Sequence, residues 1–152
     1  MLATIIVALA LFLGTPTYSY EAHIQVEGDT AFQEQIQGGL EMLAGDDTLS
    51  WWLAWASLHG VVIHQSPWSN IFYPTAFTTG IGPTKTIVFH PLSQTLDTTA
   101  TAIYIIHELT NIMDYPDVSE CRAWEIHALA TSLLRPERTE WAEQQLPAIC
   151  PQ

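Results

Sequence analysis

The residues of this chain that could do chemistry gather in segment 103–114, which reads Ile-Tyr-Ile-Ile-His-Glu-Leu-Thr-Asn-Ile-Met-Asp. In a hydrolytic zinc site, two His residues one helical turn apart bind the ion, and the Glu after the first His takes a proton from the attacking water. His107 fits the first ligand and Glu108 fits the general base, but Asn111 stands where the second His would be. Because an amide oxygen is a poorer zinc ligand than imidazole, the sequence leaves open whether this segment still holds a metal.

Each position of this motif also has an ordinary structural interpretation. A His-Glu pair occurs often as a simple dipeptide on the polar face of a helix. Asn111 could bond to a water at the site, or it could cap the helix or face solvent near its end. Asp114 lies seven residues after His107, which is about 10.5 Å along a straight helix. We therefore expect Asp114 to have a supporting or structural role rather than to share an ion with His107.

A third protein ligand would have to come from a later element, and Glu120 is the candidate. On a helix that runs antiparallel to the first after a tight turn, its carboxylate could reach the same ion. The spacing of Asp117 and Glu120 also matches a capping box, in which Glu120 bonds back to the start of its own helix. The sequence leaves both roles open. His127, two turns beyond Glu120, is expected to be a buried packing residue.

The elements that must position these residues follow from periodicity and caps. Helices are predicted over residues 29–44, 49–58, 97–114, 117–134 and 136–146, with Asp97 and either Asp117 or Ser119 as caps. Residues 61–63 and 86–89 read as short strands, and 65–84 as a long irregular segment. Four tryptophans at helical spacing are expected in the core, namely Trp51, Trp52, Trp55 and Trp124. The order predicts an α+β domain that is mostly helical, with a short two- or three-stranded sheet.

Composition bounds the class of protein. A chain of 152 residues with 48% hydrophobic and 13% charged residues suits one packed domain and argues against disorder. Against 16 Asp and Glu there are only 4 Lys and Arg, for a formal net charge of −12. Nucleic acids and anionic membrane surfaces both attract clustered basic residues. We therefore expect neither as a partner.

The N-terminus predicts export. Residues 2–13 are almost wholly apolar, and Gly14 and Pro16 end the run. This length suits a signal peptide and is short for a membrane span, although no Lys or Arg precedes it and no clear cleavage site follows. We expect residues 1–17 to be a signal peptide, with an uncleaved membrane anchor and a buried N-terminal helix as alternatives. Residues 20–152 would then form a single secreted or periplasmic domain, in contact with a membrane only through that segment if it is retained.

Two cysteines remain for the exported domain. In an oxidising compartment Cys121 and Cys150 could pair and tie the C-terminal tail to the helix that carries Cys121. The alternative is two independent thiols, and spacing alone does not decide between them.

Over residues 49–134 the chain resembles the minimal zincin-like metallopeptidases of bacteria and phages. The resemblance rests on a Trp/Leu-rich helix that ends in Leu-His-Gly-Val-Val-Ile, on the run Thr-Ile-Val-Phe-His-Pro-Leu, and on Ile-Ile-His-Glu-Leu-Thr-Asn followed by Ser-Glu-Cys-Arg-Ala-Trp-Glu-Ile-His-Ala. It implies a small zincin-like fold, a zinc ion on two His and one Glu, and a catalytic Glu. By this mapping His107, Glu108 and Glu120 are kept, and Asn111 replaces the second His.

Two functions follow from this pattern. The first is an exported metallopeptidase-like protein with a degenerate zinc site, in which Glu108 is catalytic and His107, Asn111 and Glu120 surround the metal. It could retain weak peptide hydrolase activity. The second is a pseudoenzyme, a catalytically inactive zincin-fold module that recognises a peptide or protein partner through the aromatic residues of segment 68–77. Asn111 is the residue that separates the two.

Overall fold

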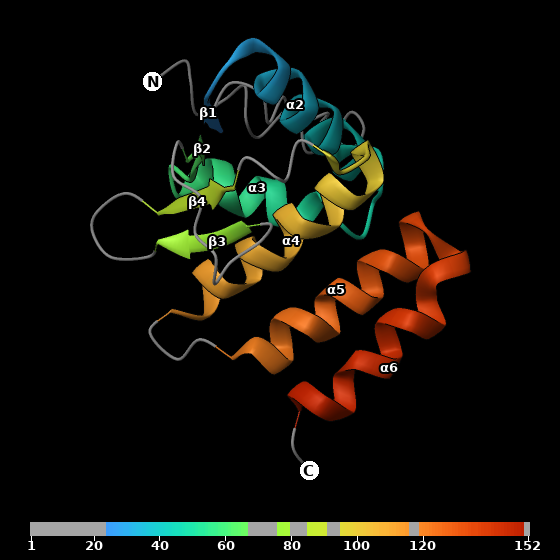
Figure 1. Ribbon diagram of the computed structural model, residues 1–152. Helices are drawn as coiled ribbons and strands as arrows, with labels where there is room; N and C mark the ends of the chain where they lie inside the picture. The colour runs from blue at the N-terminus through green and yellow to red at the C-terminus, as the bar shows by residue number, and fades with distance from the viewer. Residues whose placement is uncertain (1–23, 67–75, 80–84, 91–94, 116–118, 151–152) are drawn as a thin grey trace, which may run out of the picture.

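The computed structural model describes residues 24–66, 76–79, 85–90, 95–115 and 119–150, and for 76–79 it describes the backbone. Five α-helices, a 3-10 turn and a small four-stranded sheet make up this part of the chain (Figure 1). Most of the described residues are helical and one small sheet accompanies the helices, which confirms the predicted α+β class. The predicted signal peptide 1–17, Asp117 and most of the aromatic segment 68–77 lie outside the described residues. Among the described helices, none combines the length and the apolar character that crossing a membrane requires.

The sheet has three parallel strands and one antiparallel edge strand. The strands are β1 (Gln25–Glu27), β2 (Val62–Gln65), β3 (Ala76–Thr79) and β4 (Thr86–Phe89). Their order is β1-β2-β4-β3, with β3 antiparallel to β4. The sequence predicted β4 with these bounds, placed β2 at residues 61–63, and missed β1 and β3. The prediction that residues 65–84 are wholly irregular is therefore wrong at 76–79, because a short strand is stabilised by its neighbour in the sheet rather than by its own residues.

Local side-chain hydrogen bonds precede or cap the first two helices. Helix α2 (Thr30–Ala44) starts where the carboxylate of Asp29 accepts a hydrogen bond of 2.8 Å from the backbone N–H of Phe32. This cap satisfies a backbone group that the first turn of a helix leaves without a partner. Helix α3 (Ser50–Leu58) has no side-chain cap of its own, but it follows a turn in which the carboxylate of Asp46 accepts from the backbone N–H of Leu49 at 2.9 Å. Both helices therefore begin where the sequence predicted.

The last three helices run side by side in alternating directions (Figure 1). They are α4 (Thr98–Asp114), α5 (Glu120–Leu134) and α6 (Thr139–Ile149). Asp97 caps α4 by accepting from the backbone N–H of Ala100 at 2.8 Å, as predicted. The predicted final helix from residue 136 is divided, because a 3-10 turn, η3 (Pro136–Arg138), precedes α6.

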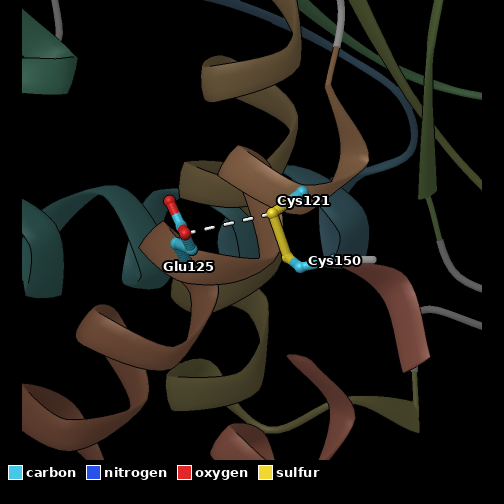
Figure 2. Close-up of side chains that lie close together, drawn as sticks. All are labelled: Cys121, Glu125 and Cys150. Carbon is cyan, nitrogen blue, oxygen red and sulfur yellow. Dashed lines mark hydrogen bonds between the residues drawn. A yellow bond between two sulfur atoms is a disulfide. The ribbon is translucent and has the colours of Figure 1, made fainter. Parts of the chain in front are cut away.

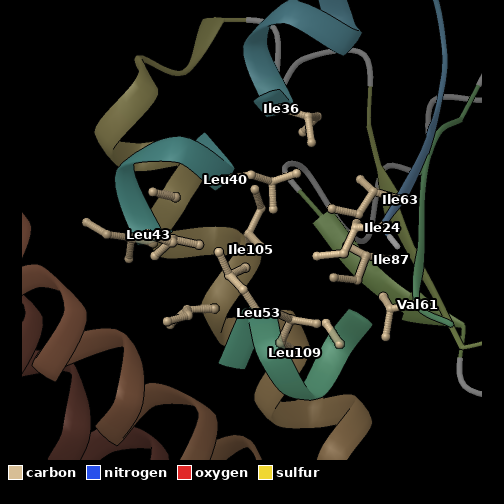
Figure 3. Close-up of a cluster of buried hydrophobic side chains, with 14 of the residues drawn as sticks. Ile24, Ile36, Leu40, Leu43, Leu53, Val61, Ile63, Ile87, Ile105 and Leu109 are labelled. Atoms are coloured by element: carbon tan, nitrogen blue, oxygen red, sulfur yellow. The ribbon is translucent and has the colours of Figure 1, made fainter. Parts of the chain in front are cut away.

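Helix α4 lies at the centre of the molecule, between α5 on one side and α2, α3 and the sheet on the other. Buried side chains from these elements meet in one cluster (Figure 3), with members such as Ile36, Leu40, Leu53, Ile63, Ile87, Ile105 and Leu109. The prediction that Trp51 belongs to the core is wrong, since its side chain is 52% exposed. Trp51 lies two positions before the buried Leu53, which is about 200° around a helix. The indole of Trp51 therefore faces outward, with its ring against that of Trp52.

Candidate metal centre

Two helices bring the candidate ligands together. His107 and Asn111 lie one turn apart near the end of α4, and Glu120 is the first residue of α5. Ser119 caps α5 by accepting a hydrogen bond of 3.5 Å from the backbone N–H of Arg122. Because α5 runs back antiparallel along α4 (Figure 1), its first turn lies against the last turns of α4. The end of α4 and the Ser119 cap of α5 therefore determine that these three residues lie close together.

The carboxylate of Glu120 is engaged by both α4 residues. Its Oε2 lies 3.4 Å from Nε2 of His107, and its Oε1 accepts a hydrogen bond of 3.2 Å from Nδ2 of Asn111. This arrangement bears on the capping role that the sequence left open for Glu120 beside the role of metal ligand. A capping box would place it third in the helix, whereas it follows the Ser119 cap directly. The capping-box interpretation is therefore wrong, and the side chain of Glu120 faces α4.

The environments of the two ionisable partners differ. The side chain of His107 is 8% exposed and that of Glu120 is 60% exposed. The hydrogen bond with His107 is the largest influence on Glu120 and lowers its pKa, while partial burial opposes this effect and the charge of His107 and the bond from Asn111 reinforce it. The anionic form of Glu120 is thus favoured by the two α4 residues. The site presents a carboxylate at the surface and an imidazole below it.

Aromatic rings form the inner wall of this site. His107 packs edge-on against Trp124 and against His127, with ring centroids 5.4 and 5.5 Å apart. Trp124 stacks on His127 at 4.6 Å. His127 is buried, as predicted, and burial together with the charge of His107 lowers its pKa to about 4. His127 is therefore neutral near neutral pH and acts as an apolar wall.

The remaining predicted residues occupy supporting positions. Glu108 is buried beside His107 on α4 and is engaged in an interaction of its own. Asp114 pairs with Arg122, with 3.3 Å between Oδ1 and Nη1. This ion pair joins the end of α4 to the first turn of α5, which agrees with the structural role expected for Asp114.

The contact between His107 and Glu120 has the dimensions of a zinc site. Ligand atoms about 2.1 Å from a tetrahedral zinc ion lie about 3.4 Å from one another, and His107 Nε2 and Glu120 Oε2 are 3.4 Å apart. Two buried atoms here, Nδ1 of His107 and Oδ1 of Asn111, have no hydrogen-bond partner among the described residues. An amide rotated by half a turn about its last bond would exchange Nδ2 and Oδ1 of Asn111. His107 and Glu120 thus fit two ligand positions, and the third position carries a neutral amide.

In the described part of the chain, no further His, Cys, Asp or Glu side chain completes the ligand set of His107 and Glu120. There, the group of three His, Cys, Asp or Glu side chains whose ligand atoms lie within 4.8 Å of one another is Cys121, Glu125 and Cys150. Figure 2 shows that the two cysteines form a disulfide, which decides between the pairing and the two independent thiols that the sequence left open. Cysteine binds metals as a thiolate, and a disulfide sulfur has neither negative charge nor proton. The 3.9 Å approach of Glu125 to the sulfur of Cys121 is therefore a contact only.

The sequence thus predicted the residues that lie together, but not the aromatic rings behind them. The structure brings His107, Asn111 and Glu120 together, whereas the stacking of Trp124 on His127 behind His107 was not foreseen. The signal was present in the spacing, because residues 120, 124 and 127 recur at i, i+4 and i+7 and so share one face of α5. Tyr104, one turn before His107, completes the wall with its ring edge-on to His127 at 5.5 Å.

Comparisons of this chain with protein-family models, with curated proteins and with solved structures return no match.

Proposed function

We propose that this protein is an exported, metallopeptidase-like protein that binds zinc weakly and hydrolyses peptide bonds slowly. The observation that carries the proposal is the 3.4 Å separation of His107 Nε2 from Glu120 Oε2, with Asn111 against the other carboxylate oxygen. Three side chains from two helices thus converge at the positions that the zincin-like pattern assigns to two His and one Glu. Export remains a prediction from residues 1–17.

Each residue of the site would have a separate role in zinc binding or peptide hydrolysis. His107 and Glu120 would hold the ion, and Asn111 would turn its amide oxygen toward it. A bound zinc ion supplies Lewis acidity that polarises the peptide carbonyl and acidifies water. Glu108, directly after His107, would accept a proton from the attacking water and pass it to the leaving amine. The wall of Trp124 and His127 would hold the imidazole of His107 in place.

Weak binding follows from Asn111. The amide is neutral and a poorer donor to zinc than imidazole. It also donates to Glu120 in the metal-free arrangement, so zinc has to displace an existing hydrogen bond. The protein is therefore expected to be loaded with zinc only when zinc is abundant.

The first test is zinc content at equilibrium dialysis against excess zinc, measured by elemental mass spectrometry after subtraction of the zinc in the dialysis buffer. We expect stoichiometric zinc in the wild type and a loss in His107→Ala. His59→Ala is the matched control, because His59 is an exposed histidine directly after helix α3 whose ring stacks on Trp55. Zinc that is absent from the wild type, or equal in all three proteins, would contradict the proposal.

The second test separates metal binding from catalysis. Asn111→His should raise zinc affinity by at least about tenfold in a chelator competition, since it supplies the missing imidazole. Glu108→Gln should leave zinc content unchanged and lower peptide hydrolysis by about 10²- to 10⁴-fold, which is the usual contribution of a general base. Hydrolysis that survives Glu108→Gln would exclude this mechanism. Loss of hydrolysis together with loss of zinc would show only that the site was disturbed, so the two are measured on the same sample.

A second function is favoured by a specific observation. Because Asn111 donates to Glu120 and His107 lies against its other oxygen, the carboxylate is satisfied without an ion. The protein could thus be an inactive module that recognises a peptide or protein partner. The predicted recognition segment 68–77 lies outside the described residues except for part of β3. Zinc content decides between the two functions, because the module needs none.

A further inference from the structure

A pocket adjoins the candidate metal centre across the ring of His127. It has a volume of about 240 Å³ and is formed by the first half of α4, the second half of α5 and the start of α6. Five of its nine lining residues are apolar or aromatic, namely Leu96, Ala100, Ile103, Tyr104 and Trp141. The disulfide between Cys121 and Cys150 joins the opposite ends of α5 and α6. The pocket is therefore built by packed helices that are held together at their far end.

The pocket holds half of the chain's strong cations. The sequence contains only 4 Lys and Arg, and two of them, Arg135 and Arg138, line this pocket. The other two are engaged elsewhere, since Lys85 lies over the ring of Trp55 and Arg122 pairs with Asp114. Two arginines beside an apolar slot, in a chain with net charge −12, form a local exception to the acidity of the molecule.

The two arginines differ in how far they are already neutralised. Arg135 is paired with Asp97, the cap of α4, and reaches Glu137 at 3.8 Å. Among the described residues, Arg138 has no carboxylate within ion-pair distance. Its guanidinium can therefore bind an anion without breaking an ion pair within the described residues. A carboxylate suits it best, because the guanidinium fork presents parallel N–H donors to two oxygens.

Size limits the apolar part of the ligand. A dry apolar cavity of about 150 Å³ holds one benzene molecule, and this pocket measures about 240 Å³. A single ring on a short linker, or an alkyl chain of medium length, would fill it. A folded protein partner or a long lipid chain would not.

We propose that this pocket binds a small carboxylic acid with an apolar body, whose carboxylate meets Arg138 at the rim and whose ring or chain lies between Tyr104 and Trp141. This proposal is independent of the zinc proposal. The pocket is lined by residues 100, 103 and 104 of α4, whereas His107 and Asn111 lie further along that helix. His127 forms a wall of the pocket and also packs against His107, so the two sites adjoin without sharing a ligand atom.

The test is isothermal titration calorimetry of the exported protein with octanoate and with 3-phenylpropionate. We expect both to bind, with affinity rising about fourfold for each added methylene from butanoate until the pocket is full. Octylamine and octanol, which match octanoate in length but carry the opposite charge or none, should bind at least about tenfold more weakly. Equal binding of octanoate and octylamine would overturn the proposal.

Variants assign the binding to this pocket. Arg138→Gln should weaken octanoate at least about tenfold, since it removes a charge-assisted hydrogen bond, and Ala100→Leu should weaken it by filling the slot. Arg122→Gln is the matched control, because this arginine lies at the other end of α5, and titration of the wild type with a chelator present tests independence from zinc. Both should give wild-type binding. Octanoate binding unchanged in both Arg138→Gln and Ala100→Leu would refute the assignment.

A final arm separates two sources of the same chemistry. A short apolar peptide with a free C-terminal carboxylate is titrated beside its amidated form. Binding of the free peptide without binding of octanoate or 3-phenylpropionate would overturn the small-acid proposal in favour of peptide capture. Binding of the small acids, with a peptide at most equally strong, would support it.

Discussion

At position 111 the chain carries an amide where a two-His site would carry an imidazole. The amide of Asn111 donates to Glu120, and His107 approaches the same carboxylate from the preceding turn of α4. A neutral donor and an imidazole can hold a carboxylate in place with or without an ion. The function of the site therefore depends on the zinc affinity that remains at a single changed ligand, which is why zinc content is the first measurement.

His127 provides a prediction at the same scale, for the metal-free protein in the presence of a chelator. Its pKa is about 4 in the folded chain, against about 6.5 when unfolded. Between these values the unfolded chain binds a proton that the folded chain does not, so the free energy of unfolding falls as pH falls. The loss contributed by His127 is about 3 kcal/mol across the whole window. His127→Phe, which keeps an aromatic ring, should remove this part of the pH dependence.

Urea unfolding of both proteins at several pH values between 7 and 4.5 measures the effect. The difference between wild type and His127→Phe isolates this residue, because the other titrating groups are common to both. The gap in unfolding free energy should shift in favour of the variant as pH falls. A gap that stays constant with pH would show that His127 does not remain neutral in the folded chain.

Among the elements, α4 carries the largest structural demand. Residues 105–112 are buried nearly all round the helix, because α2 and α3 cover one side and α5 the other. Close packing against α2 requires a small residue at the crossing. A Cβ atom added to Gly39 would lie 3.2 Å from the backbone nitrogen of Ala102 and 3.1 to 3.2 Å from the side chains of Thr101 and Ile105. Gly39 thus fixes the distance between the helix that builds the core and the helix that carries the candidate ligands.

Neighbouring glycines allow a matched test of this contact. Gly39→Ala should destabilise the protein by about 1 to 3 kcal/mol, because it overpacks a buried backbone contact. Gly38→Ala should stabilise it by about 0.5 to 1 kcal/mol, since alanine is the better helix former and the added Cβ would approach only the side chain of Thr98. Chemical denaturation measures both. Equal effects at the two positions would show that the α2–α4 approach does not depend on Gly39.

At the scale of the whole molecule, the disulfide holds the C-terminal helix in place. Helix α6 fully buries only Ala142, so its apolar contacts with α5 are limited. Cys150, directly after α6, is joined to Cys121 in the first turn of α5 across a sequence separation of 29. Export to an oxidising compartment, predicted from residues 1–17, would provide the conditions in which such a bond persists.

Reduction of this bond should lower the free energy of unfolding by about 2 to 4 kcal/mol, because the open chain gains conformational freedom on unfolding. Urea unfolding with and without reductant measures the change. The double variant Cys121→Ser/Cys150→Ser should be as unstable as the reduced protein and insensitive to reductant. Identical stability of the oxidised and reduced wild type would contradict this prediction. Octanoate binding should weaken in parallel, because α6 supplies Trp141 to the pocket wall.

Local chemistry in the sequence determined where helices begin and end. Asp97 caps α4 as predicted, and Ser119, one of the two residues predicted for α5, caps that helix. Asp29 caps α2 in the same way, because each side chain bonds to a backbone N–H three residues later. Strand β4 could be predicted from its run of β-branched and aromatic residues. Strands β1 and β3 were missed, and each pairs with one of the two central strands of the sheet. The order of the helices and of the two central strands, and with it the α+β class, was available from the sequence.

The candidate site, too, could be predicted in part from the sequence and was decided in part by the tertiary structure. The spacing of His107, Glu108 and Asn111 within one helix, and the closeness of Glu120 beyond a tight turn, could be predicted because a helix fixes which residues share a face. Whether Glu120 caps its own helix or meets α4, which ring lies behind His107, and that Arg135 and Arg138 border an apolar pocket were decided by tertiary structure alone. These contacts join residues from different helices, and their distances depend on how closely those helices pack. Packing is a property of the whole core, to which no single segment of sequence gives access.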